Sequence, residues 1–157
     1  STGKKIEMVA DDWLKNTDQY EYVDFANKTK VLVEGYEPKI TDFSIQTNSL
    51  DITDSVLNSE NILLFISYDL KKINKNSIND IKRIYNKISD EKILFLTSSN
   101  DDNIKTFKRD QALNVDFCYT DETVLKTIIR SNPGLIRIKK GTVVEKWHYN
   151  HFKNIVK

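Results

Sequence analysis

Residues 128–147, with the sequence IIRSNPGLIRIKKGTVVEKW, decide how the fold is interpreted. A helix must end at Asn132-Pro133, because proline lacks a backbone donor and the residue before it is pushed out of the helical region. An apolar strand follows, the chain turns at Lys140-Gly141, and a second strand returns antiparallel. The stretch predicts a hairpin with a proline at its entrance. The local sequence does not decide whether that proline is cis, since an X-Pro bond prefers trans by only about 0.5 to 1 kcal/mol.

Size and composition favour a single main core without partners selected by charge. The chain has 157 residues, and 24 basic against 23 acidic side chains give a net charge of +1. No overall field therefore attracts nucleic acid, and no nucleic-acid partner is expected. The longest apolar run, Ile62–Ile66, is far shorter than the roughly 20 residues that cross a bilayer. The chain begins at Ser1 without a methionine, which suggests a processed protein or a piece of a longer one.

The N-terminal part predicts a separate β-rich extension over residues 1–36, ahead of a main domain over residues 37–157. Short strand-like segments occupy residues 4–9, 20–25 and 30–34. Gly35 and Pro38 then interrupt the pattern and mark the expected boundary.

The main domain opens with alternating and fully apolar segments. Ile40–Ile45 alternates apolar and polar residues like a half-buried strand, and residues 50–53 could pair with it. The runs Ile62–Ile66 and Ile93–Leu96 suit central parallel strands that are buried on both faces. A helix between them is predicted to be capped by Ser77, and helix and strands together form a parallel crossover.

The second half continues with two helices and a short strand. Ser98 or Ser99 is expected to cap a helix that carries Asp101 and Asp102 in its first turn. Residues 117–119 are extended, Thr120 or Asp121 begins the helix that leads to Pro133, and a short helix ends the chain.

This order of elements resembles the thioredoxin fold from about Pro38 to the C-terminus. The resemblance implies an α/β fold with a mixed central sheet flanked by helices, preceded by extra N-terminal strands as in the TlpA/ResA type. A set of motifs also resembles the soluble C-terminal domain of bacterial DoxX-type membrane proteins. The motifs are GYEPKITDFSI (35–45), ISYD (66–69), DET (121–123), IRSNPG (129–134) and KWHY (146–149).

The DoxX-type resemblance implies a tether. In that family the domain follows transmembrane helices, so a membrane-associated position is expected. The resemblance favours the extracytoplasmic, periplasmic face of the inner membrane and leaves the cytoplasmic face open. A protein or peptide partner is expected, of unknown identity.

Thiol chemistry of the usual kind is missing from this sequence. Dithiol exchange needs one thiolate at the start of the helix after the first central strand and a second thiol to resolve the mixed disulfide. The corresponding slot falls near Lys71–Asn74, and the one cysteine of the chain, Cys118, lies elsewhere. Dithiol oxidoreductase activity is therefore excluded, and no cofactor is expected. His148 and His151 lack a third convergent ligand, so no metal site is predicted.

The main functional hypothesis is a non-catalytic interaction or accessory module. In thioredoxins the backbone beside a cis proline pairs with an extended polypeptide, an instance of strand addition. The equivalent groove would be formed by Tyr68, Asp69, Lys71, Lys72, Asn74, Asn132 and Pro133.

Two other functions stay open at this point. One is a single-cysteine redox enzyme or sensor that relies on Cys118 and an external thiol, although a buried and inert cysteine explains the residue more simply. The other is a structural domain whose sheet and extension stabilise an oligomer.

Overall fold

The computed structural model describes residues 6, 8–19 and 43–155. The chain divides into two compact units, Ser1–Pro38 and Lys39–Lys157. In the first unit a short helix, α1 (Ala10–Leu14), follows residues 6, 8 and 9, which are not in a strand. The strands predicted at 20–25 and 30–34 lie outside the described residues, so the β-rich extension stays a prediction.

The second unit is built on a mixed five-stranded sheet, which confirms the predicted sheet architecture. Its strands are β1 (Ile62–Ser67), β2 (Lys92–Thr97), β3 (Asp116–Tyr119), β4 (Gly134–Lys139) and β5 (Thr142–His148). They are arranged in the order β3-β2-β1-β4-β5. Strands β1, β2 and β3 are parallel, whereas β4 runs antiparallel to both β1 and β5.

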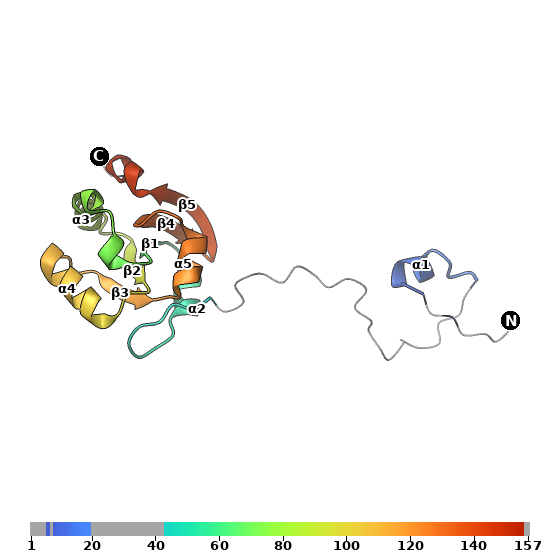
Figure 1. Ribbon diagram of the computed structural model, residues 1–157. Coiled ribbons are helices and arrows are strands. Elements are labelled where there is room, and N and C mark those ends of the chain that lie inside the picture. The colour runs from blue at the N-terminus through green and yellow to red at the C-terminus, as the bar shows by residue number, and fades with distance from the viewer. Residues whose placement is uncertain (1–5, 7, 20–42, 156–157) are drawn as a thin grey trace. The chain divides into compact units, whose positions relative to one another are not determined.

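Helices cover both faces of this sheet (Figure 1). The α-helices are α2 (Thr53–Leu57), α3 (Ile78–Lys87), α4 (Asp101–Gln111) and α5 (Glu122–Ile128), and the 3₁₀ turns are η1 (Leu70–Lys72), η2 (Lys75–Ser77) and η3 (Tyr149–Asn154). Because side chains alternate along a strand, Leu63 and Phe65 of β1 join the core beneath α3, α4 and η3. Ile62, Leu64 and Ile66 join the core beneath α2 and α5.

Two of the predicted helix caps differ from the structure in detail, and a third is confirmed. Ser77 occupies the predicted N-cap position of α3, but its hydroxyl does not bond to the helix; it donates to the carbonyl oxygen of Asn74 at 2.6 Å, because η2 runs directly into the helix. Helix α4 is capped by Asn100, whose side chain accepts from Asn103 N–H at 3.1 Å, and not by Ser98 or Ser99. Asp121, one of the two predicted residues, does cap α5.

The strand predicted over Ile40–Ile45 is also wrong where the structure describes it. Residues 43–45 lie outside any strand, and only isolated bridges at Gln46 join this segment to Asp51 and to Tyr119 of β3. Ile45 N–H donates to the hydroxyl of Thr53 at 2.8 Å, so a side chain takes the place of a strand partner. Residues 40–42 lie outside the described residues.

The hairpin after Pro133 is confirmed. Lys140 and Gly141 have φ angles of 45° and 74°, as a two-residue hairpin turn of the I′ type requires. The register shifts between Arg137 and Ile138, which pair with Glu145 and Val143, so Val144 is an extra residue on β5.

Gly134 fills a position at the start of β4 that has no room for a side chain. A Cβ there would lie 2.0 Å from Ile129 Cδ1 and 2.8 Å from Ser131 Oγ. We expect Gly134→Ala to lower the free energy of unfolding by roughly 1 to 3 kcal/mol, the usual cost of overpacking. Denaturant titration of the purified chain measures this change. Gly141→Asn is the matched control, because asparagine tolerates the turn's positive φ, and its stability should stay close to that of the parent. Equal stability of Gly134→Ala and the parent would contradict the packing described here.

Candidate functional site

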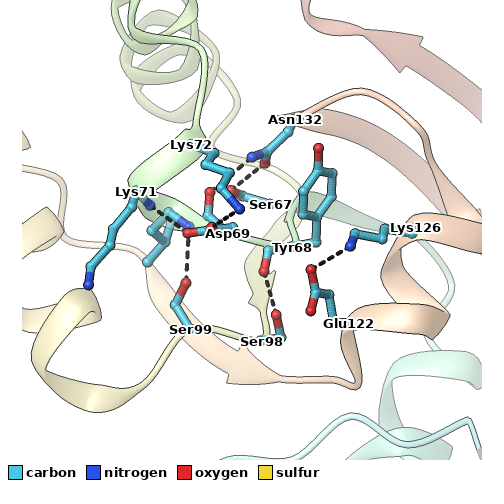
Figure 2. Close-up of polar contacts among 11 residues, drawn as sticks. Ser67, Tyr68, Asp69, Lys71, Lys72, Ser98, Ser99, Glu122, Lys126 and Asn132 are labelled. Carbon is cyan, nitrogen blue, oxygen red and sulfur yellow. Dashed lines mark hydrogen bonds and ion pairs between the residues drawn. The ribbon is translucent and has the colours of Figure 1, made fainter.

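The loop after β1 and the turn before β4 are joined by the side chain of one asparagine. The Asn132–Pro133 peptide bond is cis. Asn132 Oδ1 accepts from the hydroxyl of Ser67 at 2.6 Å, and Asn132 Nδ2 donates to the carbonyl oxygen of Asp69 at 2.9 Å (Figure 2). The carbonyl oxygen of Asn132 accepts from the backbone N–H of Asn74 at 2.9 Å. One residue therefore fixes both ends of the loop 68–74.

Local hydrogen bonds hold the same loop from within. The Asp69 carboxylate caps η1 by accepting from Lys71 N–H at 2.9 Å, and it pairs with Lys72 Nζ at 3.2 Å. The first contact is favourable because an aspartate at the start of a helical turn satisfies an unpaired backbone donor. Lys72 keeps 75% of its side chain exposed, so this ion pair contributes little to stability.

Two serines after β2 support the loop from below. Ser99 Oγ accepts from Leu70 N–H at 3.0 Å, and the hydroxyl of Ser98 donates to the carbonyl oxygen of Tyr68 (Figure 2). The predicted role of these residues was a helix cap, and their contacts to the loop were not predicted. Their position directly after a buried parallel strand was the available signal, because such strand ends meet at one edge of the sheet.

The ring of Tyr68 lies on the side of the loop that faces α5. Lys126 Nζ lies 5.1 Å from the centre of the ring, within the range of a cation–π interaction. Lys126 also pairs with Glu122 at 2.6 Å, one helical turn away. The hydrogen bond to Glu122 raises the pKa of Lys126, so this lysine stays charged.

The structure thus brings Tyr68, Asp69, Asn74 and Asn132 together, but it leaves little of the proline turn open. Asn132 is 8% exposed and Pro133 is buried. The carbonyl oxygen of Asn132, which a bound strand could use, already accepts one hydrogen bond from the backbone N–H of Asn74. Of the seven residues predicted to form the groove, Lys71 and Lys72 are the exposed ones. The binding role of the seven residues stays a prediction, and the loop side chains are the part available to a partner.

The position of Cys118 does not suit its thiol to act as a nucleophile. It lies on β3 with 1% of its surface exposed, packed in the core beneath α2 and α5. Burial raises the pKa of the Cys118 thiol, and the nearby Asp116 carboxylate raises it further, against a smaller opposite effect of Lys92. The thiol is therefore protonated at neutral pH. The neighbouring Tyr119 is equally unsuited, since burial and its hydrogen bond to Asp101 raise the pKa of Tyr119 to about 12.

His148 has a structural role at the end of β5. His148 Nδ1 accepts from Asn150 N–H at 3.1 Å and so caps η3, and its ring lies against that of Tyr149. Within residues 6, 8–19 and 43–155, no group of three or more histidine, cysteine, aspartate or glutamate side chains could hold a metal ion.

A solved structure of a known protein shares this arrangement of strands and helices. StoA from Bacillus subtilis is similar over 74% of this chain and 98% of its own, with a TM-score of 0.50 at 11% identity. The fold is thioredoxin-like. At that identity the similarity shows the fold alone. The thioredoxin-like prediction is confirmed, whereas the TlpA/ResA type and the DoxX-type resemblance stay predictions.

Other thioredoxin-like structures are more distant in shape. The exposed lipoprotein thioredoxin of Streptococcus pneumoniae is similar over 73% of this chain and 98% of its own, with a TM-score of 0.45 at 16% identity. A PrxQ variant from Xylella fastidiosa is similar over 72% and 83%, with a TM-score of 0.48 at 13% identity. The sequence matches no protein-family model and no curated protein.

The Ser67–Asn132 hydrogen bond can be tested by a double-mutant cycle. Asn132→Ala should lower the free energy of unfolding by roughly 1 to 3 kcal/mol, because it leaves the fully buried Ser67 hydroxyl without its partner. Ser67→Ala in the Asn132→Ala background should then cost less than Ser67→Ala alone. Urea titration of the four proteins gives the coupling energy. Additive effects would show that the two side chains do not interact.

The burial of Cys118 predicts a slow thiol. At pH 8 a small aromatic disulfide reagent should modify the folded chain at least about tenfold more slowly than free N-acetylcysteine, because the thiolate is the reactive form and burial disfavours it. The same reagent should react at the free-cysteine rate in denaturant, which serves as the control. A native rate above that of N-acetylcysteine would instead support the single-cysteine redox hypothesis.

Proposed function

We propose that this chain is a non-catalytic thioredoxin-like interaction domain that binds an acidic polypeptide at the loop 68–74. One observation carries the proposal. At the place where thiol exchange would need a thiolate, the chain has a loop whose polar backbone and side-chain groups are held internally by Asn132, Asp69 and Ser99. What remains for a partner is side-chain surface.

That surface is basic and aromatic. Lys71 has no ion-pair partner within the described part of the chain. Lys72 forms an ion pair with Asp69 and keeps most of its side chain exposed. Tyr68 adds a partly exposed ring beside Lys126. The unpaired Lys71 and the exposed Lys72 favour an acidic segment, because opposite charges speed association, and the ring of Tyr68 supplies contact area.

We also propose that the domain is tethered to a membrane on its extracytoplasmic face. The resemblance to the soluble domain of DoxX-type proteins supports this position. No helix within residues 6, 8–19 and 43–155 is long and apolar enough to cross a bilayer. The proposal requires membrane-spanning segments elsewhere in the native gene product, which its full coding sequence would reveal.

Charge reversal tests the binding surface. The double variant Lys71→Glu/Lys72→Glu should capture its partners from a membrane extract about tenfold less efficiently, since each reversal replaces attraction by repulsion. Quantitative mass spectrometry of the captured proteins is the measurement. Lys105→Glu/Lys153→Glu is the matched control, because it makes the same change of net charge at two exposed lysines on α4 and η3. Equal losses in both variants would mean that bulk charge, and not this loop, governs capture.

A further inference from the structure

A second feature, a pocket, lies beside the proline turn. It has a volume of about 320 Å³ and is lined by Thr127, Ile129, Arg130, Ser131, Lys146 and His148. These residues come from the C-terminal end of α5, the turn that leads to Pro133, and β5. Neither the fold nor the loop described above requires a hollow at this position.

The lining is basic without any acidic residue. Arg130 is exposed and has no ion-pair or hydrogen-bond partner within the part of the chain that the structure describes. Lys146 Nζ donates to the carbonyl oxygen of Ile128, which fixes its ammonium group at the rim of the pocket. The pocket therefore offers one uncommitted guanidinium and one ammonium group that is shared with the end of α5.

Ser131, another residue of the lining, has a hydroxyl without a hydrogen-bond partner among the described residues. Ser131 is 6% exposed, and its Oγ is buried. Its Oγ lies in the wall next to Gly134, 2.8 Å from where a Cβ of that residue would be. A buried hydroxyl without a partner is costly, so a ligand oxygen that accepts from Ser131 would satisfy a group that the protein leaves unpaired.

We infer that this pocket binds a carboxylate, supplied by an acidic side chain of the polypeptide partner. The planar guanidinium of Arg130 can donate two parallel hydrogen bonds to a carboxylate, and Ser131 can donate a third. Ile129 provides apolar surface for the methylene stem of such a side chain. An acidic side chain can use both the cations and this apolar surface, whereas inorganic phosphate can use only the cations. The assignment of the carboxylate to a polypeptide rests on the proposed function, whereas the pocket's preference for a carboxylate does not.

Binding of small probes tests the pocket directly. The 15N-labelled chain is titrated with N-acetylglutamate α-amide, with its uncharged analogue N-acetylglutamine α-amide, and with inorganic phosphate, and the backbone amide signals of residues 127–131 and 146–148 are followed. We expect saturable shifts at these residues with the glutamate compound and none with the glutamine compound. Absence of saturable shifts with the glutamate compound would overturn the inference, and so would tighter binding of phosphate.

Two variants assign the binding to named groups. Arg130→Gln should weaken binding of the glutamate compound by about tenfold, the effect of losing one charge-assisted contact. Ser131→Ala should weaken it by a smaller factor without lowering stability, because the hydroxyl has no partner to lose. Arg109→Gln, at an exposed position on α4, is the matched control and should bind like the parent. Equal affinities of Arg130→Gln and Arg109→Gln would show that Arg130 is not part of the site.

The result is separable from that of the charge-reversal experiment. If the glutamate compound binds as expected, but the Lys71→Glu/Lys72→Glu variant captures partners as well as the parent, the loop surface is ruled out and the carboxylate site is kept. Reduced capture by the loop variant, with no probe binding to the parent chain, would remove the carboxylate site and keep the loop.

Discussion

The side chain of Asn132 is the constraint on which the rest of the site depends. It bridges Ser67 at the end of β1 and the backbone of Asp69, while its own carbonyl oxygen holds Asn74. These contacts join segments more than 50 residues apart in the chain, and they lie in a buried setting where an unpaired partner would be costly. The loop cannot move away from the proline turn without breaking several hydrogen bonds together.

This internal pairing changes how a partner can bind. In strand addition the affinity comes from exposed backbone groups, and the side chains that fit pockets provide specificity. Here the backbone carbonyl at Asn132 already accepts a hydrogen bond from Asn74, and the proposed recognition relies on the charges and the ring beside the turn. The basic loop and the proposed carboxylate pocket both lie beside the proline turn, so a single acidic segment is the proposed ligand of both.

Much of the fold could be predicted from local patterns, whereas the contacts of the site could not. Ile62–Ile66 identified the central strand because a run that is apolar on both faces has few other places in a domain. Asn132-Pro133 marked the end of a helix for purely steric reasons. The cap of α4 at Asn100 and the hydroxyl of Ser77 were assigned wrongly because neighbouring polar residues compete for the same role and sequence alone does not rank them. The pairing of Asn132 with Ser67 has no local signature, since only the finished sheet brings the two together.

Strand β5 is an outer strand of the described sheet, and its features bear on how the protein behaves at high concentration. Its middle carries Glu145 and Lys146, the first paired with Arg137, and the extra residue Val144 interrupts its regular pairing with β4. Valines 143 and 144 are about half exposed, at 51% and 46%. Charged side chains and a bulge are the means by which outer strands discourage edge-to-edge growth into aggregates. Within the described part of the chain, the bulge and the charges of β5 therefore make edge-to-edge pairing of this outer strand less favourable.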